Sequence, residues 1–318
     1  MRKAIKRKIL KRYKKYRNQI HCELIKSILD ILIDFLYPNE DIIFIKANFK
    51  EIFGYPIDLE NPITFNEKLQ WLKIHNRTNL HTICADKLLV RDYVSKKIGD
   101  QYLIPLVYST KKKSKLTPKI LPDYPIIVKT NHDSGSTFVV RNKNDYDWTQ
   151  LKNKLKRSLL SNFYFASREW PYRNIPPRII VEKLLIQKNG KVPNDYRFYC
   201  TKGKVNYIQL EIDRETNHTR NIYDLDWNLL NVKRGDIPSI DNIEKPKKLN
   251  EMLSICENLS KSFIFSRVDL YYIDNETIYF GEITFYPGGG FTKFSPNEWD
   301  KTFGKMIELP LKKQNEKI

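Results

Sequence analysis

Apolar side chains recur along this sequence with two different spacings, and each spacing predicts a different kind of secondary structure. Before about residue 117 the spacing is three or four residues, which predicts helices. Residues 63–77 carry such a stripe, with Thr64 at a position suited to cap the helix. A second helix is predicted over residues 82–99, where Gly99 can close the C-terminus. Residues 1–60 also look helical and are expected to form an accessory segment.

After residue 117 the pattern changes to short alternating runs separated by turn residues, which predicts strands. Helices are expected there only near residues 147–161 and 247–262. This mixture predicts an α+β fold with mainly antiparallel sheets. We expect a basic arm and helical extension (1–60), a helical N-terminal lobe (61–117) and a core (118–318). The predicted strands cover residues 124–130, 136–141, 177–185, 195–203, 205–212, 266–273 and 278–286.

The composition is that of a folded protein that stays in a reducing compartment. Of 318 residues, 41% are hydrophobic and 29% are charged, which excludes a disordered chain. No run approaches the roughly 18–20 uncharged apolar residues of a spanning helix, and the basic start lacks the apolar region of a secretion signal. The cysteines stand far apart without CxxC pairs, which argues against a disulfide scaffold and a zinc knuckle. We therefore expect a cytoplasmic protein.

The positive charge is concentrated at the N-terminus. The formal net charge is +19, and residues 1–17 carry ten Lys or Arg and no acid, so the rest of the chain carries +9. Apolar positions at helical spacing follow at Ile20, Leu24, Ile28 and nearby. Two interpretations stay open: a solvated tail before a core helix, or peripheral contact with the inner face of a membrane through residues 1–17. A nucleic-acid partner is not expected, because the body has no known recognition signature.

The segment over residues 266–286 predicts a hairpin that carries two carboxylates. If Asn275-Glu276 form a two-residue turn, Asp269 lies opposite Glu282 and Arg267 lies opposite Thr284. The other face, with Val268, Leu270, Tyr272, Ile283 and Phe285, is then the core face. The face that carries the carboxylates would present Arg267, Asp269, Tyr271, Phe280, Glu282 and Thr284.

Two opposed carboxylates on neighbouring strands are a candidate metal site. Their Cβ atoms lie roughly 4.5–5.5 Å apart, where the charges repel unless a cation lies between them. Carboxylates, a divalent cation and an arginine are what triphosphate oxygens require. The alternative is a solvated sheet face on which Asp269 and Glu282 are incidental.

Two further segments have features of a nucleotide site. Lys129 ends an apolar strand before the loop NHDSGST, whose backbone N–H groups can bind phosphate although it is not a Walker A loop. In IIVEKLL a strand ends at Glu182 and Lys183 before apolar leucines, where backbone atoms could bind an adenine edge. The alternative for Lys129 is an ordinary lysine at the end of a strand, which is common. The alternative for Glu182 and Lys183 is a charged strand end that binds nothing.

Together, and in this order, these segments resemble the TupA-like family of the ATP-grasp superfamily, which comes from bacterial cell-surface polysaccharide clusters. The resemblance covers about residues 61–310. It rests on FNEKLQWLKIHNR, ADKLLVRDYV, IVKTNHDSGS, SREWPYRNIPPRIIVEKLL, DYRFYCTKGKV, NHTRNIYDLDWNLL, RVDLYYI and FGEITFYPGGGFTKFSPNEWD.

The resemblance implies two α+β lobes that hold ATP between antiparallel sheets, with Mg²⁺ bridging the phosphates. By it, Asp269 and Glu282 are the metal ligands and Arg267 stabilises an acyl-phosphate and its tetrahedral successor. Asp195 would bind the ribose hydroxyls. The phosphates would meet Lys129, Lys87 and a loop with Ser134, Gly135 and Ser136, and the adenine hinge would be Glu182, Lys183, Leu184 and Leu185.

Two positions depart from the family pattern. Many ATP-grasp enzymes have Asn two residues after the second acidic ligand, where this chain has Thr284. Asp133 stands where a second glycine of the phosphate loop is expected, and an acid there would repel triphosphate. Pro287–Gly290 follows the metal strand and could let backbone approach an acceptor.

The resemblance therefore implies an ATP- and Mg²⁺-dependent carboxylate–amine ligase. Its substrates would be an anionic sugar or polysaccharide precursor, with a uronic-acid or amino-sugar component, and an amine. The alternatives are a glycosyltransferase of capsule or O-antigen synthesis, a non-catalytic ATP-grasp relative, and a nucleic-acid-binding module. For the glycosyltransferase, Asp224-Leu-Asp226 has the spacing of a metal-binding DxD motif but lacks a Rossmann-like context.

Overall fold

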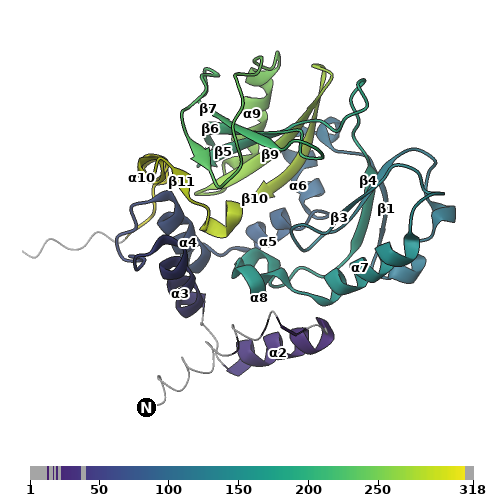
Figure 1. The fold of residues 1–318 in the computed structure, drawn as a ribbon, viewed down its shortest axis with the longest axis horizontal. Coiled ribbons are helices and arrows are strands. Elements are labelled where there is room, and N and C mark those ends of the chain that lie inside the picture. Colours follow the sequence, from purple (N-terminus) through teal and green to yellow (C-terminus); the bar gives the residue numbers. More distant parts are fainter. Residues whose placement is uncertain (1–12, 14–16, 18, 21–22, 37–40, 312–318) are drawn as a thin grey trace, which may run out of the picture.

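The structure is a computed structural model that describes residues 13, 17, 19–20, 23–36 and 41–311 (Figure 1). Most of the basic arm, residues 1–17, lies outside the described residues. In the described part of the accessory segment lie the helices α2 (Glu23–Leu36) and α3 (Asp41–Phe53). The other helices are α4 (Phe65–His75), α5 (Asn79–Ala85), α6 (Val90–Ile98), α7 (Trp148–Leu160), α8 (Phe163–Ser167), α9 (Leu249–Ser260) and α10 (Glu298–Lys305).

The smaller sheet is antiparallel and has the strand order β1-β4-β2-β3. Leu151 and Leu155 of α7 pack with Val128 and Val181 to form its core. Its strand β1 precedes residue 118, so the sheet contains strands from both sides of the domain boundary expected between residues 117 and 118. The Lys-rich segment after β1 therefore connects two strands of one sheet. The strands are β1 (Leu106–Thr110), β2 (Ile126–Thr130), β3 (Thr137–Val140) and β4 (Ile179–Lys183).

The larger sheet is also antiparallel, with the order β10-β9-β5-β6-β7. One of its faces packs against α9 in the main hydrophobic core, which also takes in Phe65 and Leu69 of α4. Its strands are β5 (Asp195–Thr201), β6 (Lys204–Ile212), β7 (Thr219–Tyr223), β9 (Ser266–Ile273) and β10 (Thr277–Thr284). A short pair, β8 (Lys233–Arg234) and β11 (Phe294–Ser295), lies beside it.

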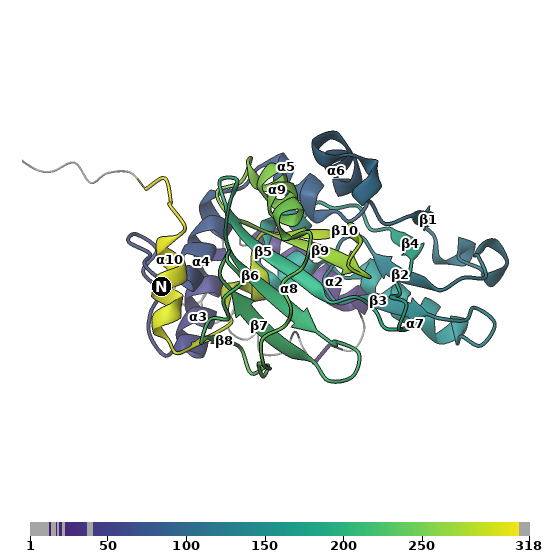
Figure 2. The same cartoon turned by 90° about the horizontal axis from the view of Figure 1, so that it is seen from above.

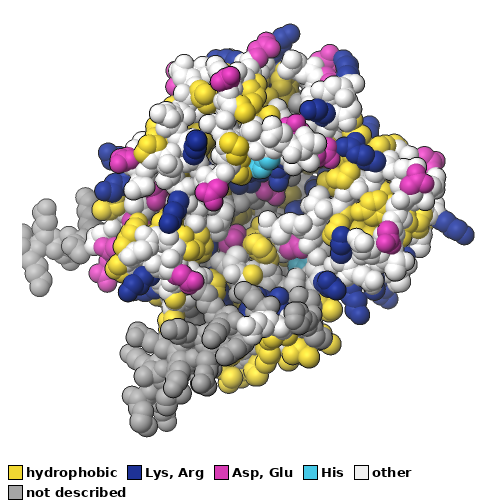
Figure 3. Space-filling model, viewed as in Figure 1, with side chains coloured by type: hydrophobic (Ala, Val, Ile, Leu, Met, Phe, Trp, Pro, Cys, Tyr) yellow, Lys and Arg dark blue, Asp and Glu magenta, His cyan; other side chains and the backbone are white. Residues whose placement is uncertain are grey.

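The arrangement confirms an α+β fold built from antiparallel sheets. Figures 1 and 2 show the two sheets as separate lobes, and α6 packs against α9 in the core of the larger one. A hollow opens between the lobes in the space-filling view, with acidic and basic side chains in its depth (Figure 3). Cys84, Cys200 and Cys256 are buried and free, as expected without a disulfide scaffold.

The first core helix begins where the sequence predicts. Thr64 accepts a hydrogen bond from the Glu67 amide, and Glu67 accepts from the Thr64 amide, which completes a capping box. The second predicted helix, however, is two helices. Asp86 ends α5 and accepts from the amides of Leu88 and Leu89, so its carboxylate replaces helical hydrogen bonds before α6 begins. This break places Lys87 between the lobes.

Candidate functional site

The two expected metal ligands face each other, although the hairpin reaches that pairing by a different route. Asp269 pairs with Glu282, and Arg267 pairs with Thr284. The turn has three residues, 274–276, instead of the predicted two, so that Ile273 pairs with Thr277; the φ angles of Asp274 and Asn275 are 52° and 57°. A bulge at Gly281 then shifts the register by one residue. The predicted pairing is therefore correct at the carboxylates and wrong near the turn.

The bulge also moves one side chain to the opposite face. Phe280 pairs with Leu270 and is buried in the core, so its predicted place on the carboxylate face is wrong. Gly281 allows the bulge because a Cβ there would lie 3.0 Å from the Asp269 carbonyl oxygen and 3.1 Å from the Tyr271 ring. The bulge at Gly281 thus allows Phe280 to face the core while Glu282, two residues later, faces the opposite side of the sheet.

We expect Gly281→Ala to reduce the free energy of unfolding by about 1–3 kcal/mol, because the added methyl crowds the neighbouring strand. Urea unfolding measures the change, with Thr277→Ala on the same strand as the exposed control. Equal stability of the two variants would contradict the close approach at the bulge.

A guanidinium group occupies the space between the two carboxylates. Arg267 donates from Nε and NH2 to the two oxygens of Asp269, at 2.6 and 2.5 Å, and from NH2 to Glu282 at 3.0 Å. Thr284, which replaces the expected Asn, donates to the same Glu282 oxygen at 2.9 Å. Arg267 therefore supplies the positive charge that two opposed carboxylates require, and Thr284 orients Glu282.

The carboxylates have opposite electrostatic environments. Burial raises the pKa of Asp269 to about 6, although Arg267 and Arg197 act to lower it. Glu282 has a side chain that is 44% exposed to the cleft. The penalty of burial there is outweighed by Arg267 and Lys87, which lower the pKa of Glu282 to about 2. Glu282 is thus the ionised oxygen donor at the mouth of the site.

The two carboxylates belong to a larger charged face on the side of the main sheet opposite α9. Cross-strand pairing aligns Glu282 with Asp269, and Asp269 with Arg197. A second row aligns Asp195 with Glu211 and Glu211 with Arg220. We call this surface the charged face; it consists of Asp195, Arg197, Glu211, Arg220, Arg267, Asp269 and Glu282.

Asp195, the expected ribose ligand, lies on the charged face but is buried and paired. Its carboxylate accepts from Arg197 at 3.0 Å and from Arg214 at 2.5 Å. It would need to retain these partners or exchange one of them to bind hydroxyl groups. Its assignment to ribose stays a prediction.

The expected phosphate ligand Lys87 reaches the same site from the segment between α5 and α6. Its ammonium donates to the carbonyl of Asp133, and its amide donates to the carbonyl of Asn131. Burial lowers the pKa of Lys87, while Glu282 and Asp133 act to raise it. Lys87 therefore holds the loop of the smaller lobe, and its charge interacts with Glu282 of the larger sheet.

Lys129 and Glu182 form an ion pair on the smaller sheet, with Nζ and Oε2 2.7 Å apart. The lysine is thus held at the sheet surface by the first residue of the expected adenine hinge. In that hinge, the amides of Lys183 and Leu184 donate to the carbonyls of Pro105 and Pro125. A bound adenine would therefore have to use other backbone atoms of the hinge, such as those of Leu185.

The expected phosphate loop is open at its tip and anchored at its ends. Ser134 and Gly135 are exposed, whereas Ser136 bonds Ser158 of α7 through its hydroxyl at 2.7 Å. Asp133 is buried at the base of the loop, and its Oδ1 has no hydrogen-bond partner among the described residues. The acid lies below the exposed tip, next to Lys87, rather than on it.

Sequence reasoning missed a buried lysine and glutamate beside this site. Lys73 of α4 is fully buried, and its Nζ donates to the carbonyls of Ser167 and Gly289 at 3.0 and 2.7 Å. Glu169 is buried nearby, and burial raises its pKa while Lys73 acts to lower it. The charge of Glu282 also acts on Glu169, which connects this pair to the metal carboxylates.

The turn Pro287–Gly290 is held rigidly against the same pair. Gln70 donates to the carbonyls of Gly289 and Gly290, and Arg234 donates to that of Pro287. Its three glycines have φ angles of 60–66°, which other residues adopt at a cost. The segment is thus an anchored turn next to the carboxylates and differs from a plain flexible one.

The Asp224-Leu-Asp226 motif serves a local turn. Asp224 accepts from the amides of Asp226 and Asn228 at 3.0 and 2.8 Å. This use of the carboxylate is that of an Asx turn and gives no support to a metal-binding DxD motif.

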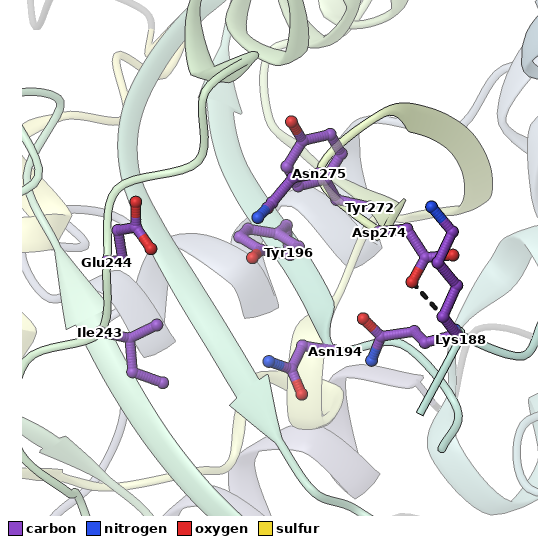
Figure 4. A pocket seen from close by; sticks show the side chains of 9 residues that line it. Lys188, Asn194, Tyr196, Ile243, Glu244, Tyr272, Asp274 and Asn275 are labelled. Atoms are coloured by element: carbon purple, nitrogen blue, oxygen red, sulfur yellow. Dashed lines mark hydrogen bonds between the residues drawn. The ribbon is translucent and has the colours of Figure 1, made fainter. Parts of the chain in front are cut away.

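A pocket of about 420 Å³ lies apart from the charged face (Figure 4). Tyr196 and Tyr272, which line it, belong to the core face of the larger sheet. Lys188 donates to Asp274 at 3.0 Å and joins the neighbouring loop to the hairpin turn. Asp195 alternates with Tyr196 along β5, so this pocket adds nothing to the metal site.

The donors of the charged face fit Mg²⁺. Mg²⁺ prefers oxygen and is commonly held by one or two carboxylates together with phosphate oxygens and water. Asp269 and Glu282 provide two carboxylates. Within residues 23–36 and 41–311 there is no cluster of three or more His, Cys, Asp or Glu suited to an ion, so substrate and water would complete the coordination.

The sequence matches the family described as TupA-like ATPgrasp over residues 67–308. The chain belongs to the TupA-like ATP-grasp family. This confirms the resemblance drawn from the motifs and accounts for the two lobes. Among curated proteins there is no significant match.

Solved ATP-grasp structures are similar only at a distance. A D-alanine–D-alanine ligase from Bacillus anthracis complexed with ATP is 17% identical, with 64% of this chain and 53% of that chain covered and a TM-score of 0.37. The Coxiella burnetii D-alanine–D-alanine ligase is 15% identical, with 70% of this chain and 54% of that chain covered and a TM-score of 0.40. The ATP-grasp ligase PsnB, in a complex with Mg and ADP, is 12% identical, with 69% of this chain and 57% of that chain covered and a TM-score of 0.39. The chain thus spans little more than half the length of these proteins.

Proposed function

We propose that this protein is an ATP- and Mg²⁺-dependent carboxylate–amine ligase. The observation that carries the proposal is the opposed pair Asp269 and Glu282, arranged around Arg267, with the charge of Lys87 from the segment between α5 and α6 acting on Glu282. Two carboxylates, a buried guanidinium and a cleft lysine form a charge arrangement suited to a metal–triphosphate. Family membership supports the same chemistry.

In the proposed reaction the substrate carboxylate attacks the γ-phosphorus of ATP and ADP leaves, which gives an acyl-phosphate. The amine then attacks the acyl carbon, inorganic phosphate leaves and the nitrogen loses a proton. Mg²⁺ would be held by Asp269 and Glu282 and would neutralise phosphate charge. Lys87 and Lys129 bind the phosphates, with the Ser134–Ser136 loop above them. Arg267 holds both carboxylates in place, so its first role is to position them.

Glu169 is the proposed acceptor of the proton that the amine loses. Its carboxylate is buried beside Lys73, and burial raises its pKa, which suits a group that must take up a proton near neutral pH. The rigid turn Pro287–Gly290 lies between this pair and the metal strand and would form the wall against which the amine is held.

The substrate class follows from the family and the charge. We propose an anionic sugar or polysaccharide precursor with a uronic-acid or amino-sugar component, destined for a bacterial surface polysaccharide. We place the reaction in the cytoplasm, with peripheral contact through residues 1–17 at the inner face of the membrane. Within the described ranges, no helix is long and apolar enough to cross a bilayer.

The experiment that tests the proposal is calorimetric titration with ATP and Mg²⁺. Glu282→Ala should weaken metal-dependent binding at least tenfold, because the ionised ligand at the cleft mouth is lost. Glu276→Ala, on the exposed tip of the same hairpin, is the matched control and should bind normally. Equal binding by wild type and Glu282→Ala would remove Glu282 from the metal site.

Turnover is tested next. Release of ADP should require Mg²⁺, a uronate and an amine together. Tight nucleotide binding without ADP release for any such pair would favour the non-catalytic relative.

A further inference from the structure

Helix α2 turns its apolar side away from the protein. Seven of its large apolar residues are 47–80% exposed, with Phe35 the most exposed of them, whereas Leu29 and Ile33 are partly buried. In Figure 3 they form a hydrophobic strip along the lower edge of the molecule, where Figure 1 shows α2. We call this strip the α2 face; it consists of Leu24, Ile25, Ile28, Ile31, Leu32, Phe35 and Leu36.

The orientation is the reverse of that in an ordinary surface helix. At 3.6 residues per turn, the α2 face spans an arc of about 140°, and Asp30 lies on the opposite side. Asp30 is buried, and Arg17 donates to both of its oxygens at 2.7 and 2.8 Å. The helix packs against α7. The ion pair thus joins α2 to the segment just before it, and the contact with α7 leaves the apolar side of the helix outward.

A continuous apolar strip of this kind is rare on a monomeric soluble protein and indicates a binding surface. The sequence just before it indicates what binds. Residues 1–17 carry ten basic residues and no acid, so the apolar strip follows directly on a strongly cationic segment. An amphipathic helix next to a basic segment has the two features that hold a protein at an anionic lipid surface.

A second copy of this chain fits the same strip less well. A two-fold interface through α2 would bring two such N-terminal segments toward each other. Each would carry its ten positive charges with no acid among them to compensate. An anionic bilayer compensates that charge while it covers the apolar side chains.

We propose that the α2 face docks on an anionic phospholipid bilayer, with its apolar side chains below the headgroups and the basic residues that precede Arg17 held against the headgroup charge. The helix then lies in the plane of the surface. This adds an apolar contact to the electrostatic contact proposed above, and it does not depend on the ligase reaction.

The test is co-sedimentation of the full chain with vesicles. Vesicles of phosphatidylcholine containing phosphatidylglycerol should bind the wild type, and vesicles of phosphatidylcholine alone should bind it weakly. The double variant Ile31→Ser/Phe35→Ser keeps the net charge and should partition at least tenfold less. Ile120→Ser, at a similarly exposed apolar position on the smaller lobe, is the matched control and should bind as wild type does.

Two results would overturn the proposal. Equal binding by the wild type and the double variant would show that charge alone holds the protein on the vesicles. A dimer detected by light scattering that the double variant loses, without vesicle binding by either protein, would assign the α2 face to a second copy. Thermal unfolding by circular dichroism shows whether the variants are folded, and a second pair, Ile28→Ser/Leu32→Ser, replaces the first if that one is not.

Discussion

Replacing Arg267 with methionine is expected to lower the free energy of unfolding by about 3–5 kcal/mol. The side chain is only 7% exposed, and its guanidinium holds Asp269, Glu282 and Thr284 together. Methionine fills a similar volume but leaves two close carboxylates without their shared counter-charge. The loss therefore comes mainly from electrostatic repulsion in a buried site.

Excess Mg²⁺ should return part of that stability to Arg267→Met and give less to the wild type. Without the guanidinium, Asp269 and Glu282 form a more negative site, which binds a divalent cation more strongly. Urea unfolding with and without MgCl₂ measures both effects. Because Arg267 also places the ligands, nucleotide binding should still be weaker than in the wild type.

Arg141→Met is the control for removal of an arginine. Arg141 and its partner Glu215 are 48% and 38% exposed, so that ion pair should contribute less than about 1 kcal/mol. A similar loss in both variants, with no added effect of Mg²⁺ on Arg267→Met, would contradict the role of Arg267 between the metal carboxylates.

The sequence was sufficient to predict the pairing of the carboxylates but not the backbone that achieves it. Alternation indicates which residues can share a face, whereas the pairing of Asp269 with Glu282 was predicted from an assumed two-residue turn at Asn275-Glu276. That pairing is correct because the longer turn and the bulge at Gly281 together give the same register at the carboxylates. It does not reveal a bulge, which depends on how closely Gly281 approaches the next strand. Asp and Asn tolerate left-handed conformations, so Asp274-Asn275 carried a turn signal that was overlooked.

Lys73 and Glu169, which the sequence analysis missed, show a different limit of the sequence. Lys73 lies on a helix with many polar neighbours and has the appearance of a surface residue. It is buried because Gly289 and Ser167, both distant in sequence, supply carbonyls to its ammonium. No local pattern contains such contacts. The resemblance to a family was based on the motifs and their order along the chain. The burial of Lys73 and the outward apolar side of α2 became visible only in the folded structure.

The charged face should make stability depend on pH through Glu211. This carboxylate is fully buried and accepts from Arg197 and Arg220 at 2.7 and 2.8 Å. Burial acts to raise its pKa, but the two arginines and His218 outweigh it and lower the pKa from 4.5 to about 2. A carboxyl whose pKa is lower in the folded state stabilises the fold above pH 4.5 and loses that contribution as the pH falls toward 2.

We expect this group to account for about 3 kcal/mol of stability at neutral pH, since each pKa unit corresponds to about 1.4 kcal/mol. Glu211→Gln should lose at least that amount at neutral pH, because two buried arginines are then left without their anion. The difference between variant and wild type should shrink as the pH falls from about 4.5 to 2. Urea unfolding over this range measures it, with the half-exposed Glu215→Gln as the control.

The same substitution should also weaken the metal site. Arg197 donates to Glu211 and lies 3.5 Å from Asp269, so the buried glutamate fixes the arginine that faces a metal ligand. When Glu211 is neutral, Arg197 should move toward Asp269 and compete with Mg²⁺ for its oxygens. Calorimetry with Mg²⁺ and ATP should then show weaker binding by Glu211→Gln at a pH where the variant is fully folded. If Glu211→Gln lowers the stability but leaves the binding of Mg²⁺ and ATP unchanged, Glu211 has a structural role only. The charged face would then stabilise the fold through Glu211 without using that residue in ligand binding.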